Sequence, residues 1–134
     1  MIWGGTLLGT GTFIASRHLW RRMKITDIAR LPVGKNPHQV DVRMAYDTEH
    51  AVAVVITLQP GEELKKHITP VDVFFYVLEG TGVAEIGDEE EEVRKDMLVE
   101  SPATIPHRWF NRSDALFRFL VVKVPKPTKG TQML

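Results

Sequence analysis

The sequence predicts an all-β protein, built as a sandwich or barrel of short antiparallel strands. Apolar, β-forming residues come in short runs, and residues that favour turns interrupt them about every 8–12 positions. No amphipathic stretch of about 10–15 residues lies between the runs, which argues against a parallel sheet with crossover helices. The expected strands span residues 40–46, 51–58, 73–78, 83–86, 97–100, 107–110 and 116–124.

The segments between and beyond these strands have local signals of their own. Residues 25–31 predict one short helical turn, because Pro32 cannot continue a helix. The acidic run 89–92 is expected on a solvated hairpin face, since four consecutive side chains on a strand alternate between faces and do not converge on a cation. The tail, residues 125–134, is expected to be loose because it is polar and contains Pro and Gly.

Charge and cysteine content exclude several classes of function. The chain has 17 basic and 17 acidic residues, so it carries no overall field that would attract nucleic acid or an acidic membrane surface. We therefore expect neither nucleic acid nor a membrane among its partners. The absence of cysteine excludes disulfides, thiolate ligands and a cysteine nucleophile, and it fits a cytoplasmic location.

Residues 1–22 differ in composition from the rest of the chain. Residues 1–16 are uncharged and rich in Gly and Thr, and a basic cluster follows at Arg17, Arg21 and Arg22. A secretory signal would place the positive charge first, and the stretch is shorter than the roughly 20 residues that a spanning helix needs. Its Gly-Thr-Gly-Thr-Phe sequence lacks the Lys-Ser/Thr of a phosphate loop, so we expect no nucleotide cofactor. A membrane anchor is the alternative, but we expect residues 1–22 to be a poorly structured extension and residues 23–134 a single domain.

Two of the five histidines, His67 and His107, stand beside predicted strands in patterned surroundings. Two imidazoles that face one barrel interior from different strands can bind one metal ion. The alternative is a pair of hydrogen-bonded core residues. His38 and His50 flank strands in polar surroundings and are expected at the solvated surface, while His18 lies in the extension.

The residues around His67 resemble the first sequence motif of the cupin family. That motif reads Gly, five residues, His-x-His, three or four residues, Glu, six residues, Gly. Gly61 precedes His67 by the required five residues, and Gly80 closes the motif after the sequence Tyr-Val-Leu-Glu. The resemblance implies a cupin-like double-stranded β-helix, also called a jelly-roll barrel, that follows a short N-terminal extension.

The residues around His107 resemble the second cupin motif, which reads Gly, five residues, Pro-x-Gly, two residues, His, three residues, Asn. Pro102, His107 and Asn111 fall at the matching positions, while Asp96 and Thr104 stand in the two glycine positions. The resemblance covers most of the chain, from about residue 40 to residue 124. Two motifs in register are far more specific than either one alone.

The departures from the motifs concern the metal ligands. The second histidine position holds Thr69 and the glutamate position holds Val73, so His67 and His107 are the two usual ligands that the chain retains. Asp72 is a candidate third ligand: strict alternation turns it away from the interior, but Pro70 could cause a bulge that turns it inward. A set of two histidines and one aspartate would resemble the facial triad of non-heme iron sites.

The predicted pocket also has Thr69, which can hydrogen-bond a bound water, and Trp109, which shares the parity of His107. Phe75 and Val77 have the parity of His67 and are expected to fill the core.

The resemblance implies a protein that binds a small molecule and has an incomplete histidine-based metal site, and it leaves open whether that site is catalytic. A divalent ion is implied, and the residues do not distinguish Zn, Fe, Mn and Ni. The alternatives are an effector-binding or sensor domain without metal or catalysis, and a structural dimer. Fold does not choose among these functions, because the family includes enzymes and non-enzymatic proteins. A homodimer is expected, since residues 116–124 are apolar on both faces.

Overall fold

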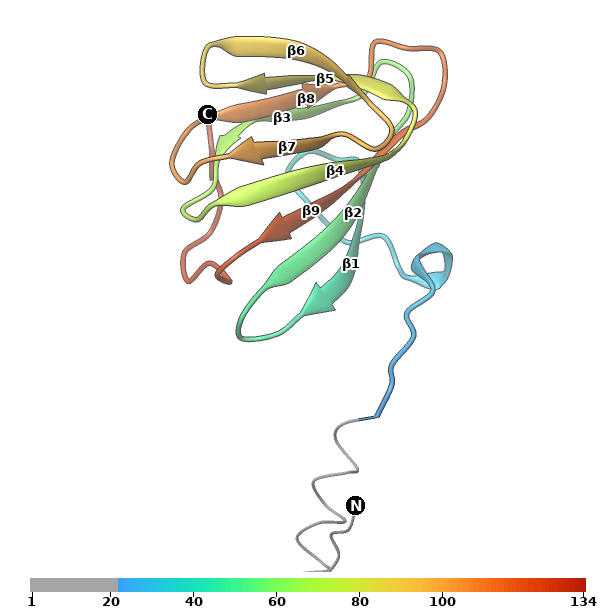
Figure 1. Ribbon diagram of the computed structural model, residues 1–134, viewed down its shortest axis with the longest axis vertical. Helices are drawn as coiled ribbons and strands as arrows, with labels where there is room; N and C mark the ends of the chain where they lie inside the picture. The colour runs from blue at the N-terminus through green and yellow to red at the C-terminus, as the bar shows by residue number, and fades with distance from the viewer. Residues whose placement is uncertain (1–21) are drawn as a thin grey trace, which may run out of the picture.

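The computed structural model describes residues 22–134 as a barrel of two facing antiparallel sheets (Figure 1). From residue 22 to the first strand the chain forms one 3-10 turn, Ile28–Arg30, as the sequence predicted. The side chain of Asp27 caps this turn by accepting a hydrogen bond from the backbone N–H of Ala29. Ten strands follow in the described part: β1 (Asp41–Asp47), β2 (Val52–Leu58), β3 (Glu63–Ile68), β4 (Val73–Glu79), β5 (Thr81–Ile86), β6 (Glu89–Arg94), β7 (Leu98–Ser101), β8 (His107–Phe110), β9 (Phe117–Lys123) and β10 (Gln132–Met133).

The strand order is that of a double-stranded β-helix. One sheet has the order β1-β2-β9-β4-β7 and the other has the order β10-β3-β8-β5-β6, with antiparallel pairing throughout. Apart from the hairpins β1-β2 and β5-β6, neighbouring strands in each sheet come from different halves of the sequence, so β3 pairs with β8 and β4 with β9. This pairing is what brings His67 and His107, 40 positions apart in the chain, to one end of the barrel.

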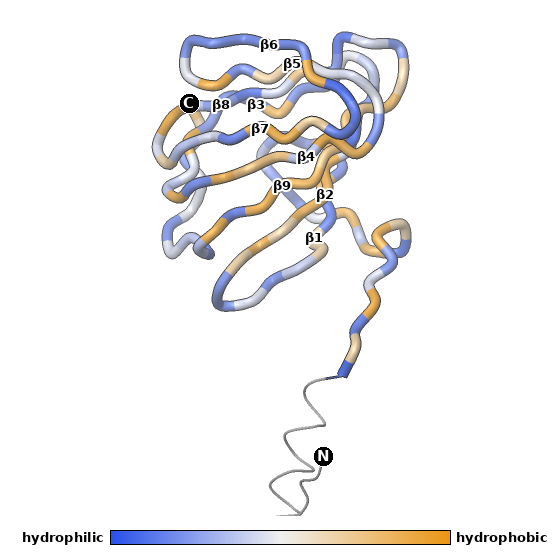
Figure 2. Tube along the Cα trace, in the orientation of Figure 1, coloured by the Kyte–Doolittle hydropathy of each residue, from blue (hydrophilic) through white to orange (hydrophobic). Residues whose placement is uncertain are grey.

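All seven predicted strands are present, and three further strands were not predicted. β3 is rich in charge, and a bulge between Leu64 and His67 interrupts its alternation, so both of these side chains are buried although they are three residues apart. β6 pairs with β5 in a hairpin and carries the acidic run, whose side chains are exposed to solvent, as predicted (Figure 2).

The prediction of a loose tail is wrong for its last residues. Gln132 and Met133 form β10, and they pair with Ile68 and His67 of β3. Backbone hydrogen bonds to an exposed sheet edge do not require apolar side chains, so composition alone missed this strand.

The core between the sheets is aromatic. Trp109 of β8 packs against Phe75 of β4 and against Phe117 and Phe119 of β9, with ring centroids 4.6–5.9 Å apart. All four side chains are essentially inaccessible to solvent. The orange colouring along β2, β4 and β9 in Figure 2 shows the apolar strands that supply much of this core.

Four motif positions share an unusual backbone conformation. Gly61 and Gly80 have φ of 87° and 81°, and Asp96 and Thr104, which stand where the motif has glycine, have φ of 70° and 67°. At Gly80 a side chain is also excluded by space, because a Cβ would lie 2.1 Å from the carbonyl oxygen of Leu116. The backbone shape of the motifs is therefore kept where the glycines themselves are replaced.

In residues 22–134 no helix has the length and apolar character needed to cross a membrane. The prediction of a poorly structured extension concerns residues 1–22, of which 1–21 lie outside the described residues.

Candidate functional site

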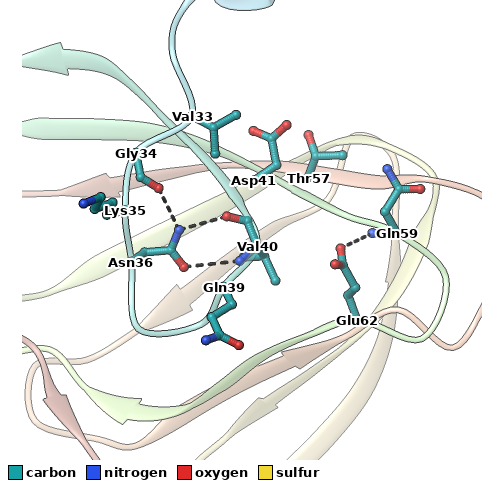
Figure 3. Close-up of a pocket in the computed structure, with 10 residues that line it drawn as sticks. All are labelled: Val33, Gly34, Lys35, Asn36, Gln39, Val40, Asp41, Thr57, Gln59 and Glu62. Carbon is teal, nitrogen blue, oxygen red and sulfur yellow. Dashed lines mark hydrogen bonds between the residues drawn. The ribbon is translucent and has the colours of Figure 1, made fainter.

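The two predicted histidines meet in one cavity of the barrel. The cavity has a volume of about 240 Å³ and lies between the two sheets and the loop that precedes β1. Its wall is largely apolar, with contributions from β1, β2 and β4. The lining residues with polar side chains are Asn36, His38, His67, Thr69, His107, Lys123 and Thr131. A larger, more open hollow of about 640 Å³ lies on the surface beside the same loop, and no histidine lines it (Figure 3).

His67 and His107 are 6% and 2% exposed and lie opposite each other on β3 and β8. Their Nε2 atoms are 2.9 Å apart, and the ring planes meet at 83°. The structure therefore brings these two predicted site residues together in one cavity.

The outer nitrogen of each ring is held by the protein. The Nδ1–H of His67 donates to the carbonyl oxygen of Lys65 at 2.6 Å, which leaves the Nε2 lone pair of the neutral ring free. Nδ1 of His107 lies 2.8 Å from the hydroxyl of buried Ser101. Because a hydroxyl both donates and accepts, Ser101 can serve either tautomer of His107. Such outer hydrogen bonds orient imidazoles that bind metals.

The sequence placed His38 at the solvated surface, and this prediction is wrong. His38 is partly buried, lines the cavity, and stacks at a tilt on His67 with ring centroids 4.7 Å apart. Asn36 positions it, because the Oδ1 of Asn36 accepts from the backbone N–H of His38. The Nδ2 of Asn36 donates to the carbonyls of Gly34 and Val40, and these two bonds are drawn in Figure 3. The alternation of buried and exposed side chains predicts the faces of strands but not the path of a loop, so no sequence signal placed His38 in the cavity.

The peptide of Lys65 fixes the tautomers of two histidines at once. Its N–H donates to Nδ1 of His38 at 2.9 Å, while its C=O accepts from Nδ1 of His67. Neutral His38 therefore carries its proton on Nε2 and is a hydrogen-bond donor, whereas neutral His67 offers an Nε2 lone pair. His38 cannot be a neutral metal ligand while it keeps the bond to Lys65.

Burial and mutual repulsion keep the histidines neutral. Desolvation, reinforced by the charges of His67 and the nearby lysines, lowers the pKa of His38 to about 4. Desolvation, followed by the charges of His67, Lys123 and His38, lowers the pKa of His107 to about 3. The pKa of His67 is also lowered by desolvation, although its bond to Lys65 opposes the shift. The lone pairs needed for binding a metal are thus available at neutral pH.

Lys123 is a further cavity residue that the sequence analysis overlooked. It ends β9, lines the cavity, and has a pKa lowered by desolvation. The alternation of β9 contained the signal, because counting by twos from the buried Phe117, Phe119 and Val121 reaches Lys123.

Thr69 and Val73 both face the cavity, as their motif positions require. Thr69 is 2% exposed, and its Oγ1 lies 3.4 Å from Nε2 of His107.

The structure does not bring Asp72 to the histidines. Its carboxylate accepts a hydrogen bond from the backbone N–H of Ala103 at 2.8 Å, and it lies beside an outer hollow rather than in the cavity. No bulge separates it from β4, whose register with β9 is regular from Val73 to Val77, so strict alternation holds.

Trp109 does not line the cavity. It lies behind Phe75, in the aromatic core, and Phe75 itself forms part of the cavity wall.

The two imidazoles fit a divalent ion in spacing but not in number. With metal–nitrogen bonds of about 2.0–2.1 Å, two ligand nitrogens lie about 2.9 Å apart when the N–metal–N angle is a right angle, and about 3.3 Å apart when that angle is tetrahedral. The observed 2.9 Å matches the first value. It also matches a hydrogen bond in which His107 donates to His67. Within residues 22–134 no group of three or more His, Cys, Asp or Glu side chains is arranged to bind a metal.

Comparisons with known proteins agree with the fold. The profile of the family described as "Cupin domain" matches residues 54–123, just over half of the chain. A crystal structure of a Thermus thermophilus protein is 32% identical, with a TM-score of 0.68 over 78% of this chain and 100% of that one. No curated protein matches the chain.

Two more distant structures share the fold alone. The polyketide cyclase RemF from Streptomyces resistomycificus is 20% identical, with a TM-score of 0.73 over 84% of this chain and 86% of its own. A cupin superfamily protein from Desulfitobacterium hafniense is 15% identical, with a TM-score of 0.60 over 70% of this chain and 84% of its own. With the family profile, both histidine motifs and the β-helix topology in agreement, this chain belongs to the cupin domain family.

Proposed function

We propose that this protein is a small-molecule-binding cupin in which His67 and His107 hold a divalent metal ion at the inner end of the cavity. The observation that carries the proposal is the convergence of two neutral, buried Nε2 atoms, 2.9 Å apart, whose Nδ1 atoms are both held from outside. A metal ion bound there would act as a Lewis acid that orients a ligand and polarises its oxygen atoms. The chain's own residues supply two ligands and a cavity, and Thr69 supplies a hydroxyl for a bound water.

The small number of ligands sets the expected affinity. Most structural sites surround the ion with four protein ligands and catalytic sites use three, so a pair of histidines should bind more weakly and leave more positions to solvent or ligand. We expect one metal per chain that prolonged dialysis against a chelator removes.

The test is the binding of Zn²⁺ and Mn²⁺ to metal-free, untagged protein, measured by calorimetry. His107→Ala should abolish the binding while circular dichroism shows that the fold is kept. The matched control is His50→Ala, because His50 is exposed and bonded to Glu49; it should leave the affinity unchanged. A metal that survives chelator dialysis would mean that another ligand completes the site.

A second candidate is an effector-binding or sensor domain without metal. The specific observation that favours it is that the histidines already satisfy each other through the bond between their Nε2 atoms, with Thr69 and Val73 in the other two ligand positions. Failure of the wild-type protein to take up either ion at any concentration would favour this candidate.

We further propose that the protein forms a homodimer in the cytoplasm. Cross-strand partners share a face, so Leu120 and Tyr76 lie together on the outer face of the β1-β2-β9-β4-β7 sheet, beside Val122 and Phe74, and all four side chains are partly exposed. A second copy that covers this row would remove apolar surface from water. Sedimentation equilibrium should give twice the chain mass, and Leu120→Glu should give the monomer mass. The cytoplasmic location rests on the absence of cysteine.

A further inference from the structure

The cavity has a charge pattern that the proposed metal site does not use. Lys123 and the histidines are its titratable lining residues, and no Asp or Glu of the described chain lines it. Its other polar groups are the side chains of Asn36, Thr69 and Thr131. No side chain that lines the cavity within residues 22–134 therefore supplies a negative charge to balance this lining.

Lys123 lines the cavity, where its charge can act on a bound ligand. On β9 it is paired directly with Val52 of β2 and Val73 of β4, and both of these neighbours line the cavity. It is partly buried, and within residues 22–134 its side chain forms neither an ion pair nor a hydrogen bond. Its charge also lowers the pKa of all three cavity histidines. An ammonium that is partly removed from water and has no protein partner is stabilised by a negatively charged ligand.

His38 adds a directed donor to this charge. The bond from the N–H of Lys65 to Nδ1 leaves the proton on Nε2, and Nε2 has no hydrogen-bond partner in the described part of the chain. The cavity therefore presents an ammonium and an N–H donor, and a metal ion at the histidine pair would add further positive charge. Donors and cations together suit an acceptor that carries negative charge.

The size and the remaining wall limit what that acceptor belongs to. The volume of about 240 Å³ corresponds to roughly eight water molecules at about 30 Å³ each. Most of the wall is aliphatic, with Val42, Val54, Ile56, Leu64 and Val121 among its members. A short hydrocarbon chain would bury its surface against these residues.

We propose that the ligand of this cavity is a small organic acid, with its carboxylate paired to the ammonium of Lys123 and hydrogen-bonded by Nε2–H of His38. The inference rests on the proposed small-molecule function of the same cavity and names its ligand class. The aliphatic part of the acid lies against the β1 and β2 side of the wall. Lys123 sets the preference for charge, and His38 directs the carboxylate.

The experiment compares isosteric probes that differ in charge. Butyrate and butyramide, and pyruvate and pyruvamide, are titrated into ¹⁵N-labelled protein, and affinities are taken from the amide shifts of residues 119–123 and 65–69. Each acid should bind at least about tenfold more tightly than its amide, a difference of about 1.4 kcal/mol. Lys123→Met, which keeps the length of the side chain, should remove the difference. Lys95→Met is the matched control, because Lys95 is exposed in the turn between β6 and β7.

A further variant guards against a folding defect in Lys123→Met. Lys123→Arg keeps the charge and should keep the preference for the acid. Equal affinity of acid and amide, shifts that map outside the cavity, or no binding of any probe at millimolar concentration would each overturn the inference.

Repeating the titrations on metal-free and Zn²⁺-loaded protein separates this inference from the proposed metal site. Discrimination between acid and amide in a protein that takes up no metal would refute the metal site and leave the ligand class standing. Metal binding without discrimination between acid and amide would support the metal site and refute the ligand class.

Discussion

At the scale of single residues, the hydroxyl of Ser101 is the contact on which the histidine pair depends. Without metal, His107 donates from Nε2 to His67 and its Nδ1 accepts from Ser101; with metal, Nε2 is needed as a lone pair and Nδ1–H must donate instead. Ser101 serves both states. We expect Ser101→Ala to lower metal affinity by about 10- to 100-fold. Calorimetry with Zn²⁺ measures it, and an unchanged affinity would show that the hydroxyl plays no part.

Thr104 is the second residue whose individual chemistry can be tested. A β-branched residue at φ of 67° is strained, at a cost of about 1–3 kcal/mol. Glycine removes this strain but loses about 0.5–1 kcal/mol to the entropy of the unfolded chain. We therefore expect Thr104→Gly to raise the free energy of unfolding by about 1 kcal/mol. Urea denaturation is the measurement, with Thr104→Ala, which keeps the unfavourable φ, as the control that should not gain stability.

At the scale of elements, β10 ties the end of the chain to the strand that carries His67. Met133 pairs with His67, the N–H of Leu134 donates to the carbonyl of Lys66, and nearby Thr131 contributes to the cavity wall. Removing residues 131–134 should cost about 1 kcal/mol, or roughly 3–6 °C in Tm. Hydrogen exchange should accelerate at residues 66–68 and stay unchanged in β5 and β6. An unaltered Tm and exchange pattern would mean that β10 does not support the site.

Asn111 joins the end of β2 to the loop between β8 and β9 through its side chain. Its buried amide donates to the carbonyls of Leu58 and Ala115 and accepts from Ser113, and the backbone groups beside it bond with Gly61 and Glu62. Asn111→Ala would remove this donor from the buried carbonyl of Leu58 and leave a gap in the barrel, so we expect a loss of about 2–4 kcal/mol. The second-motif asparagine thus holds the first motif in place rather than touching a ligand. Ser113→Ala, which removes a more exposed partner of the same amide, should cost less in the same urea titration.

At the scale of the whole molecule, the neutral histidines make stability depend on pH. His107 and His38 have pKa values lowered to about 3 and about 4 in the folded chain, against 6.5 when unfolded. The unfolded state therefore binds protons first as pH falls, and stability present above pH 6.5 is lost down to about pH 4 for His38 and about pH 3 for His107. The slope is at most about 1.4 kcal/mol per pH unit for each histidine. Lys123 and His67, which face both rings, contribute to these shifts.

Urea denaturation of metal-free protein between about pH 7.5 and about pH 5 measures that slope. His107→Gln should reduce the slope of the unfolding free energy against pH, whereas His50→Gln, at an exposed position, should leave that slope unchanged. A slope that is the same in wild type and His107→Gln would contradict neutral burial of His107.

Local patterns in the chain were enough to establish the class of fold and the histidine pair at its centre. Seven strands were predicted from apolar runs between turn residues. The spacing of His67 and His107 within the two motifs predicted that these two side chains meet. Such patterns predict burial because side chains on a strand alternate strictly between faces. The same rule argued against Asp72 as a ligand, and the structure keeps it outside the cavity.

The surroundings of that pair depend on contacts that exist only in the folded chain. His38 reaches the cavity through a loop that Asn36 folds, β3 depends on a bulge, and β10 is a strand because an edge was available. These features arise between segments distant in sequence, about which local propensity and alternation carry no information. The bond of Ser101 to His107 joins the end of β7 to the start of β8, two strands of different sheets. Motif spacing therefore identifies the two histidines, whereas the donors that complete their cavity are brought together by folding.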